Sequence, residues 1–417
     1  MSRQQQIIVI GGGAAGLMAA GTAAEAGARV RLLEKMKRPG RKLCISGKGR
    51  CNLTNVADLR DFIQHFGKNG RFLHQPFSRF FAPELIDFFE THGLPLATER
   101  GGRVFPDRGK ATDVYHVFLD WLQRLNVPIT TSSPVSRLLV DQGRITGVRC
   151  QHRTLSANAV ILATGGSSYP ATGSTGDGLE LARQVGHSFT PVRPALVPLV
   201  TETTHLDGLN GLALKNVSVR LFVNGKRKKQ LFGEMGFTRY GVNGPMILTL
   251  SGYCVDCLRA GKTLQLAIDL KPALDAHKLD NRLQRDLRKR HGEPISSILR
   301  GLLPHPLVPV CLRLTRIDPE RLGAVMSGGE RRRLGVWLKD FRLPITGHRP
   351  LKEAIVTAGG IHLKEINPNT MGSLKVNGLY IVGELLDLHG DTGGYNLQAA
   401  FSTGRLAGQS AARALQP

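Results

Sequence analysis

Three glycines near the start of the chain, Gly11, Gly13 and Gly16, have the type and spacing that could bind a phosphate group. They follow the apolar run of residues 7–10 and open an alanine-rich segment with good helix propensity, which predicts a strand, a tight turn and a helix. Gly11 permits the sharp turn, Gly13 lets the backbone approach a pyrophosphate, and Gly16 lets helix and strand pack closely. The stretch is therefore typical of a dinucleotide-binding βαβ unit.

The neighbouring residues complete this unit. Free N–H groups at the start of the helix, at Ala14 and Ala15, favour phosphates together with the helix dipole. Residues 28–34 predict the second strand, which ends in Glu34, where a carboxylate accepts hydrogen bonds from an adenosine ribose and disfavours a 2′-phosphate. The combination indicates bound FAD or NAD, and the alternative is a glycine turn with a purely structural role.

A basic, glycine-rich segment follows Glu34, over residues 35–55. Its composition argues against a regular buried element and predicts a loop that wraps an anion with backbone N–H and guanidinium groups. Because the loop directly follows the ribose-binding acid, its natural anion is the cofactor pyrophosphate; the alternative is a solvated basic loop. The cofactor-binding residues predicted here are Lys35, Arg41, Lys42, Ser46, Gly47, Gly49, Arg50 and Asn52.

Later strands end in a similar way. Residues 159–166 run from apolar β-formers into glycines, a buried strand ends at Gly383 beside Glu384, and the glycine pair at 393–394 opens a helix. These segments close the nucleotide domain around an insertion. Together with the strand that starts at residue 135, they add the predicted cofactor-binding residues Val135, Thr164, Gly165, Gly383, Glu384, Gly394, Asn396 and Leu397.

Length and charge restrict the class of protein. A chain of 417 residues, 41% of them hydrophobic, is long enough for two or three folded domains. The formal net charge is +24, from 56 Lys and Arg against 32 Asp and Glu. A large positive field attracts polyanions, so nucleic acid is the leading partner, ahead of an acidic membrane surface and of a role in solubility alone.

The six cysteines are scattered, which suits a reducing compartment. Cys254 and Cys257 have the spacing of a redox pair or of half a zinc site, but no second pair completes a metal site. We therefore predict two ordinary thiols in an apolar strand or turn, and no metal. Residues 7–24 carry no charge, yet the glycine pattern explains them better than a membrane span or a signal peptide, so we predict a cytoplasmic protein without a membrane partner.

The middle of the chain has different patterns. Residues 58–93 predict two amphipathic helices, residues 193–271 an antiparallel β region with a hairpin turn at 224–225, and residues 273–341 a helical region. The spacing of Leu279, Leu283 and Leu287 predicts one buried stripe. The cations predicted to form a basic platform in this insertion are Lys226, Arg227, Lys228, Lys229, Arg331, Arg332 and Arg333.

Four runs, residues 39–55, 237–245, 357–360 and 378–398, resemble the bacterial HI0933-like flavoprotein family. Its members are variously called BaiN-like, aminoacetone-oxidase-like or ribosomal RNA dihydrouridine synthases, and the resemblance spans essentially the whole chain. It implies an α/β fold of the two-dinucleotide-binding-domain type with bound FAD and an inserted module, antiparallel β-barrel-like plus helical. The boundaries we expect are 1–192 and 343–417 for the discontinuous, Rossmann-like FAD domain, 193–272 for the β insertion and 273–342 for the helical insertion.

The resemblance also implies roles for particular residues. The acid of the C-terminal strand, here Glu384, would lie near the ribityl and pyrophosphate groups, and the helix that follows would polarise the isoalloxazine. The chain departs from the family where many members have His and often Ser, at Arg239 and Asn243. A role of that His would not carry over; Arg239 would instead bind an anion or polarise a carbonyl.

The leading hypothesis for function is an FAD-dependent oxidoreductase, a ribosomal RNA dihydrouridine synthase. Reduced flavin would give hydride to C6 of an unstacked uracil while an acid protonates C5. The candidate acid is Cys51, with Tyr395 and His389 as rivals, and Arg239 with the platform cations would hold RNA phosphates. No second glycine fingerprint follows a strand, so NAD(P)H is expected as a transient reductant; which of the two, and the oligomeric state, stay open.

Two other hypotheses stand beside this one. The second is a small-molecule flavoenzyme, either an amine oxidase or a reductase of activated C=C bonds, in which the charge serves solubility alone. The third is a flavin-bearing binding protein without turnover.

Overall fold

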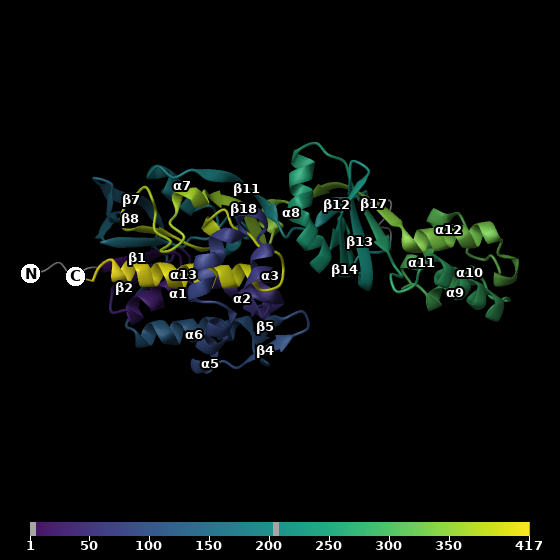
Figure 1. Ribbon diagram of the computed structural model, residues 1–417, viewed down its shortest axis with the longest axis horizontal. Helices are drawn as coiled ribbons and strands as arrows, with labels where there is room; N and C mark the ends of the chain where they lie inside the picture. Colours follow the sequence, from purple (N-terminus) through teal and green to yellow (C-terminus); the bar gives the residue numbers. More distant parts are fainter. Residues whose placement is uncertain (1–5, 203–207, 417) are drawn as a thin grey trace, which may run out of the picture. The chain divides into compact units, whose positions relative to one another are not determined.

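The computed structural model describes residues 6–202 and 208–416 (Figure 1). It divides into two compact units, the first formed by Met1–Ala195 with Leu351–Pro417 and the second by Leu196–Pro350. The second unit is thus an insertion within the first. The chain returns to the first unit at Leu351 rather than at 343, because the strand over residues 341–348 pairs within the inserted unit.

A parallel five-stranded sheet forms the centre of the first unit, in the order β19-β10-β1-β2-β6. The central strands β1 and β10 are largely continuous apolar runs because both faces of the sheet are covered there, and Ile7, Ile8 and Val9 of β1 have no exposed surface. The strands are β1 (Gln6–Ile10), β2 (Arg29–Leu33), β6 (Ile129–Thr130), β10 (Ala159–Leu162) and β19 (Leu379–Ile381).

Two helices pack closely beside this sheet, α1 (Ala14–Glu25) and α13 (Tyr395–Arg413), and Figure 1 shows them running alongside each other. Glycines make this approach possible. A Cβ atom at Gly404 would lie 2.3 Å from the carbonyl oxygen of Ala15, and one at Gly408 would lie 2.5 Å from that of Ala19. The N-terminus of α13 is therefore held in a fixed place relative to α1.

The remaining elements of the first unit surround this centre. Residues 58–93 form two short helices, a 3-10 segment and a longer helix rather than the two predicted helices, and the predicted basic loop contains a helix. These elements are α2 (Arg41–Gly49), β3 (Thr54–Asn55), α3 (Leu59–Gln64), η1 (Gly67–Leu73), α4 (His74–Arg79), α5 (Ala82–Thr91), β4 (Leu96–Glu99), β5 (Arg103–Pro106), α6 (Ala111–Arg124), β7 (Val135–Asp141), β8 (Arg144–Cys150), β9 (Arg153–Ser156), η2 (Pro170–Thr172), α7 (Asp177–Gln184), β11 (Phe189–Ala195), η6 (Leu351–Glu353), β18 (Val356–Ile361), η7 (Leu363–Glu365) and η8 (Gly383–Leu385).

The second unit contains a closed antiparallel barrel in the order β12-β15-β14-β13-β16-β17. Its strands are β12 (Leu199–Thr201), β13 (Ala213–Val223), β14 (Lys226–Thr238), β15 (Gly241–Asn243), β16 (Leu264–Asp269) and β17 (Phe341–His348). The predicted β region also contains a helix, α8 (Pro245–Arg259), which places Cys254 and Cys257 one turn apart in the buried core rather than in a strand or turn.

Helices complete the second unit: α9 (Ala276–Lys289), α10 (Ile295–Ile298), η4 (Leu299–Gly301), α11 (Leu307–Thr315), η5 (Gly323–Val325) and α12 (Gly328–Lys339). The predicted stripe of Leu279, Leu283 and Leu287 on α9 is buried. These leucines share one hydrophobic core with the barrel, so the predicted β and helical insertions form a single unit.

Candidate cofactor and catalytic site

Several of the predicted cofactor residues follow the carboxyl ends of β1, β2, β10 and β19, at one edge of the parallel sheet. Two positions of the glycine turn after β1, Gly11 and Gly16, leave no room for a side chain. Gly11 has a φ of +100°, and a Cβ atom there would lie 2.5 Å from the carbonyl oxygen of Ala163. A Cβ at Gly16 would lie 1.9 Å from that of Gly11, and one at Gly383, after β19, would lie 2.9 Å from Cβ of Ala15. Three strand ends therefore meet at the start of α1.

Open space and free backbone donors meet at the same point. A Cβ atom at Gly13 would find no atom within 4 Å, and α1 has no side-chain hydrogen bond at its N-cap. The N–H groups of the first turn are normally unsatisfied within a helix, and here they include those of Ala14 and Ala15. These residues fit the pyrophosphate of a dinucleotide.

Glu34 is buried and held by two backbone N–H groups. Its Oε2 accepts from Gly12 N–H at 2.8 Å and its Oε1 from Met36 N–H at 2.7 Å. Each carboxylate oxygen can accept a second hydrogen bond, which leaves capacity for ribose hydroxyls. The glycine turn therefore orients the Glu34 carboxylate, which was predicted to act beside this turn.

A polar network joins Lys42 to Glu384, two predicted residues from opposite ends of the chain. The Lys42 ammonium lies 2.8 Å from Oε2 of Glu384 and donates to the Ser168 hydroxyl at 2.6 Å. Glu384 also accepts from Ser168 at 3.1 Å and from the N–H of Thr357 at 2.7 Å. Sequence reasoning missed Ser168 and Thr357, although both lie next to glycine pairs that it used as signals, at 165–166 and 359–360.

Other residues of the predicted anion loop have partners of their own. Arg50 is paired with Glu99 at 2.6 Å and lies over the Phe105 ring at 4.4 Å. Lys35 lies 2.5 Å from Asp177 of α7, and the Ser46 hydroxyl donates to the carbonyl oxygen of Leu43 at 2.7 Å. Arg41 is half-buried on α2.

The end of α2 turns through left-handed backbone. Gly47, Lys48 and Gly49 have φ values of +56°, +57° and +84°, and this run ends the helix. With its amide oxygen facing Gly394, Asn52 accepts a hydrogen bond from that N–H group at 3.0 Å. Asn52 therefore supports the N-terminus of α13.

The turn before α13 is tightly held. A Cβ atom at Gly394, where φ is +102°, would lie 2.3 Å from the carbonyl oxygen of Thr54. The Asn396 amide donates to the carbonyl oxygens of Gly390 at 2.9 Å and Asp391 at 3.1 Å. Leu397 is half-buried beside it.

The positions of two predicted cofactor residues, Thr164 and Val135, give weaker support to that role. Thr164 follows β10 as predicted, with Gly165 beside it at a φ of +73°, but its hydroxyl is buried against Gly178 of α7 and has no hydrogen-bond partner among the described residues. Val135 begins β7 and pairs with Cys150, in a separate three-stranded sheet.

The predicted acid Cys51 is enclosed by protein. Its side chain has no exposed surface, and burial raises the pKa of the thiol to about 12. A thiol inside the hydrophobic core cannot reach a substrate, so the structure argues against Cys51 as the acid. The prediction rested on its place in the motif, which does not reveal burial.

A histidine that sequence reasoning missed lies beside the rival candidate Tyr395. The ring of His65, from the residue after α3, stacks on that of Tyr395 with centroids 3.9 Å apart, and its Nδ1 lies 2.8 Å from Asp391. Burial raises the pKa of Tyr395 to about 12, which keeps its hydroxyl protonated at neutral pH. The other rival, His389, is half-buried in the same turn. His65 and Asp391 are far apart in the sequence, so their pairing could not be predicted from it. The only indication in the sequence is that the chain has a His and an Asp at these positions.

The predicted platform cations lie on different elements of the second unit. Lys226, Arg227, Lys228 and Lys229 are exposed on β14 beside the hairpin turn, whereas 331–333 belong to α12. Of the latter, Arg331 is paired with Asp280 at 2.7 Å, Arg333 donates to the carbonyl oxygen of Thr315, and Arg332 is exposed. Arg239 lies over the Tyr240 ring, 4.5 Å from its centroid.

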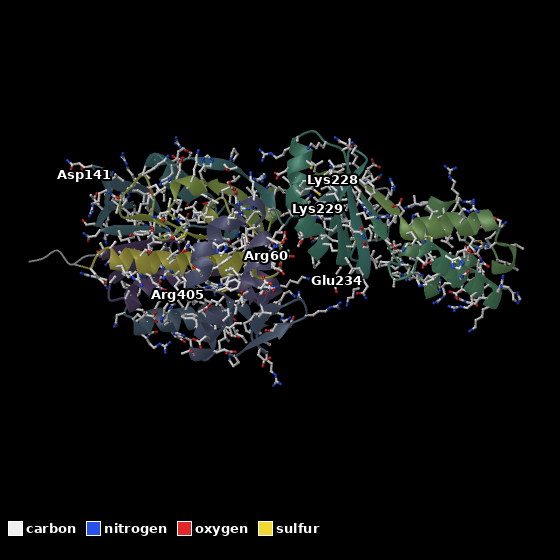
Figure 2. All side chains as sticks on the ribbon, in the orientation of Figure 1. Arg60, Asp141, Lys228, Lys229, Glu234 and Arg405 are labelled. Atoms are coloured by element: carbon white, nitrogen blue, oxygen red, sulfur yellow. The ribbon has the colours of Figure 1, made fainter. Side chains whose placement is uncertain are left out.

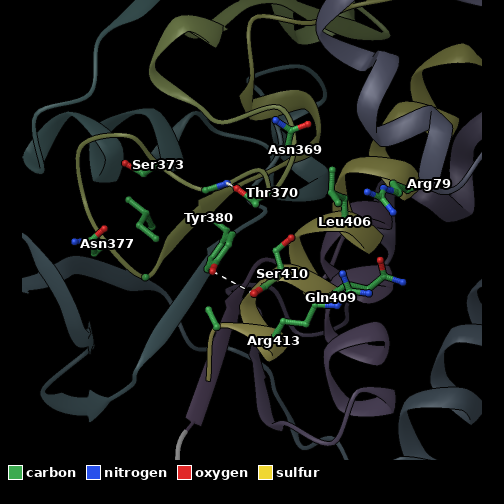
Figure 3. Close-up of a pocket in the computed structure, with 14 residues that line it drawn as sticks. Arg79, Asn369, Thr370, Ser373, Asn377, Tyr380, Leu406, Gln409, Ser410 and Arg413 are labelled. Carbon is green, nitrogen blue, oxygen red and sulfur yellow. Dashed lines mark hydrogen bonds between the residues drawn. The ribbon is translucent and has the colours of Figure 1, made fainter. Parts of the chain in front are cut away.

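A cavity of about 350 Å³ in the first unit is a different site (Figure 3). It lies at the start of β19 and against the last turns of α13, so it is at the other ends of these elements from the glycine turns. Arg79, Tyr380 and Arg413 are among its lining residues, and none of the predicted site residues is.

Within residues 6–202 and 208–416, no helix is long and apolar enough to cross a membrane, and no group of three or more His, Cys, Asp or Glu side chains could hold a metal ion.

A parallel sheet with a glycine turn, a helix N-terminus free to bind phosphate and an acid at the end of the second strand defines a dinucleotide-binding fold. The chain belongs to the HI0933-like family: the model described as HI0933-like protein Rossmann domain matches residues 5–410. The family is one of FAD-dependent oxidoreductases, so the predicted family, fold class and cofactor class are confirmed.

Two curated relatives match nearly the whole chain. The 3-dehydro-bile acid delta(4,6)-reductase of Clostridium scindens is 33% identical over 410 residues, which cover 98% of this chain and 99% of the relative. The ribosomal RNA dihydrouridine synthase of Escherichia coli is 30% identical over 402 residues, which cover 95% of each chain.

A solved structure shares the fold at low sequence identity. The 3-ketosteroid-delta4-(5alpha)-dehydrogenase of Rhodococcus jostii RHA1 has a TM-score of 0.53 and 16% identity, with 98% of this chain and 97% of that chain covered. This likeness concerns the fold alone.

Proposed function

We propose that this protein reduces a carbon–carbon double bond and that its substrate is a uridine of ribosomal RNA. The names of the two relatives described above refer to the reduction or saturation of such a bond, which supports the reaction class. The observation that favours RNA is the charge of the inserted unit, where Lys and Arg are twice as numerous as Asp and Glu. A polyanionic substrate is the partner that such a surface attracts.

The first unit would hold the cofactor with residues already described. The start of α1 and the open space at Gly13 would bind the pyrophosphate, Glu34 the ribose, and Lys42 with Glu384 the groups near the second glycine turn. Bound FAD would supply the hydride, and NAD(P)H is the reductant we expect to restore it. The chain itself has then to supply a proton.

We assign this proton to His65 rather than to Cys51. The His65 side chain is 36% exposed, whereas that of Cys51 is fully buried. Asp391 fixes Nδ1 of the ring, so Nε2 is left to exchange a proton, and Tyr395 holds the ring plane by stacking. His65→Gln would keep the polar contact to Asp391 and remove proton donation. We expect it to slow product formation strongly while the flavin still binds.

A small-molecule reductase is the second candidate function. It is favoured by the Clostridium scindens relative, whose name specifies a bile acid substrate. In this case the charge of the inserted unit would have another role, and purified protein with NAD(P)H would reduce conjugated enones without any dependence on RNA.

The deciding experiment compares ribosomal RNA from cells with and without the gene, by mass spectrometry of digested nucleosides. We expect dihydrouridine to fall in the deletion and to return with the wild-type gene, but not with Gly13→Asp, which places a charged side chain in the phosphate site. Unchanged dihydrouridine would contradict the RNA proposal and leave the enone assay to test the alternative.

A further inference from the structure

The strand register of the barrel places a set of aromatic and cationic side chains on one face. On β13, Val219, Leu221 and Val223 are buried in the barrel, so the residues between them point outward. Residues that pair directly across an antiparallel ladder share a face. The outward residues Arg220 and Phe222 pair with Gln230 and Arg227 of β14, and Phe232 of β14 pairs with Ser218, which is buried.

The same row continues across the next two strands. Phe222 pairs with Gln265 of β16, and Arg220 pairs with Ala267, which in turn pairs with Arg342 of β17. We call this surface the outer barrel face and define it by Arg220, Phe222, Arg227, Gln230, Phe232, Gln265 and Arg342.

A β-bulge decides which hairpin cations belong to this face. Leu221 pairs with Lys229 and Phe222 with Arg227, so Lys228 is the extra residue. Lys229 shares the side of buried Leu221 and lies 5.1 Å from the Tyr253 ring of α8. Among the cations near the turn that pair with β13, Arg227 is therefore the one beside Phe222. Figure 2 labels Lys228, Lys229 and Glu234 of β14.

The charges on the outer barrel face leave it positive. Arg220 and Arg342 share a single carboxylate, that of Asp340, at 2.8 and 2.7 Å. Arg227 adds a further cation, Asp269 is paired with Lys339 at 2.6 Å, and Glu234 is the exposed acid further along β14. Two guanidinium groups on one carboxylate keep one positive charge for a partner.

Aromatic and amide groups lie between these cations. Phe232 is 62% exposed, which is unusual for a phenylalanine, and Phe222 has the Arg342 guanidinium over its ring at 5.2 Å. The amides of Gln230 and Gln265 are held by Ser218 and Arg342. An exposed ring among guanidinium groups is the combination that stacks a base and pairs with its phosphates.

We propose that the outer barrel face binds a single-stranded segment of RNA, with a base stacked on Phe232 and phosphates paired with Arg227 and Arg342. This inference rests on the proposed RNA substrate and names the surface that holds it. A protein partner would favour a broader apolar patch than one exposed ring among cations.

The test measures binding of a fluorescently labelled single-stranded 12-nucleotide RNA to the full-length, FAD-loaded protein by anisotropy. We expect Phe232→Ala to weaken binding roughly tenfold, because stacking on an aromatic ring contributes substantially for each base. Arg227→Gln should weaken it about three- to tenfold by removing a phosphate contact. Flavin absorbance and circular dichroism show that each variant is folded.

A matched control separates this face from charge in general. Arg259 is an exposed cation on α8, and Arg259→Gln removes the same charge away from the outer barrel face. We expect less than about a twofold effect from it. Equal losses in Arg227→Gln and Arg259→Gln, or an unchanged affinity in Phe232→Ala, would overturn the proposal. A change in self-association caused by Phe232→Ala, without a change in RNA affinity, would assign the face to a protein contact instead.

The two proposals fail in distinguishable ways. If the gene deletion removes dihydrouridine and the Phe232→Ala gene restores it with wild-type RNA affinity, only the binding face is wrong. If dihydrouridine is unaffected by the deletion while Phe232→Ala still weakens RNA binding, the face stands and the proposed reaction is wrong.

Discussion

Gly13 and Gly16 are three residues apart, yet a side chain would meet opposite surroundings at the two positions. At Gly13 an added Cβ would face open space, whereas at Gly16 it would lie 1.9 Å from the carbonyl oxygen of Gly11. We therefore expect Gly13 to be required for ligand binding, whereas Gly16 is required by the fold.

This difference makes a prediction at the residue scale. Gly13→Asp should give a protein that folds but is colourless, because the carboxylate occupies and repels the phosphate site. Gly16→Val should destabilise the fold itself, by about 1–3 kcal/mol or more through overpacking. The ratio of absorbance at 450 and 280 nm and the melting temperature of the FAD-free proteins measure the two effects. Full flavin occupancy in Gly13→Asp would contradict the assignment of the phosphate site.

The role of a residue could be predicted from the sequence where the residues that define this role are neighbours along the chain. The glycine turn and Glu34 could be predicted because turn, helix start and strand end are neighbours along the chain. Cys51 was chosen for its motif, but burial depends on tertiary packing that the motif does not contain. His65 was missed because its partners Asp391 and Tyr395 are far away in sequence.

At the scale of elements, the amino-acid composition gave wrong secondary-structure predictions where glycine and apolar residues are mixed. Residues 41–45 of α2 are helical although a loop was predicted, whereas Ser46 is extended and Gly47 and Lys48 have left-handed backbone. The helix Pro245–Arg259 was hidden in a region of β alternation. The bulge at Lys228 could not be predicted either, because an extra residue is defined only against its partner strand.

One buried polar cluster, centred on Glu365, links the residues after α7 to η7 and to the loop that follows η7. Glu365 accepts hydrogen bonds from His187, from the Ser188 N–H and hydroxyl groups, and from Lys375, each at 2.9 Å. Burial alone would raise the pKa of this carboxyl, but the hydrogen bonds outweigh burial and hold the pKa at about 2. Burial also lowers the pKa of His187, so its ring favours the neutral form.

The cluster predicts a specific pH dependence of stability. A carboxyl whose pKa falls from 4.5 to about 2 on folding stabilises the fold above pH 4.5, and this contribution is lost as the pH falls towards 2. Glu365→Gln should therefore melt at a lower temperature than wild type at pH 7, with a difference that shrinks below pH 4.5. Because the Glu365 carboxylate also raises the pKa of His187, the comparison is made in a His187→Gln background, where that ring cannot titrate. Melting curves between pH 3 and 7 test this, and a constant difference would contradict it.

At the scale of the whole molecule, the cation excess is unevenly divided. The inserted unit is the smaller of the two, but it has twice as many Lys and Arg as Asp and Glu. The charge could be counted from the sequence alone. Which cations share a surface could not, because salt bridges such as Arg331 with Asp280 and the register of the barrel decide it.

This distribution predicts a steep salt dependence for RNA binding. If about three phosphates are contacted, the slope of log affinity against log salt should be about −2 for single-stranded RNA. Arg227→Gln should make the slope less negative by roughly 0.7, and Arg259→Gln should leave it unchanged. Anisotropy titrations from low to moderate salt measure these slopes. A slope near zero in the wild type would speak for a small, uncharged substrate.

The two places where the chain passes between units lie side by side in each unit. In the inserted unit, the entry strand β12 pairs with the exit strand β17, with Leu199 opposite His348. In the first unit, Ala195 at the end of β11 pairs with Val356 at the start of β18. A segment whose ends lie together can be added to a host domain without stretching it. Residues 196–350 therefore have the form of a cassette that evolution could exchange through two junctions, so that one ancestral redox domain could acquire new substrates by recombination rather than by gradual change.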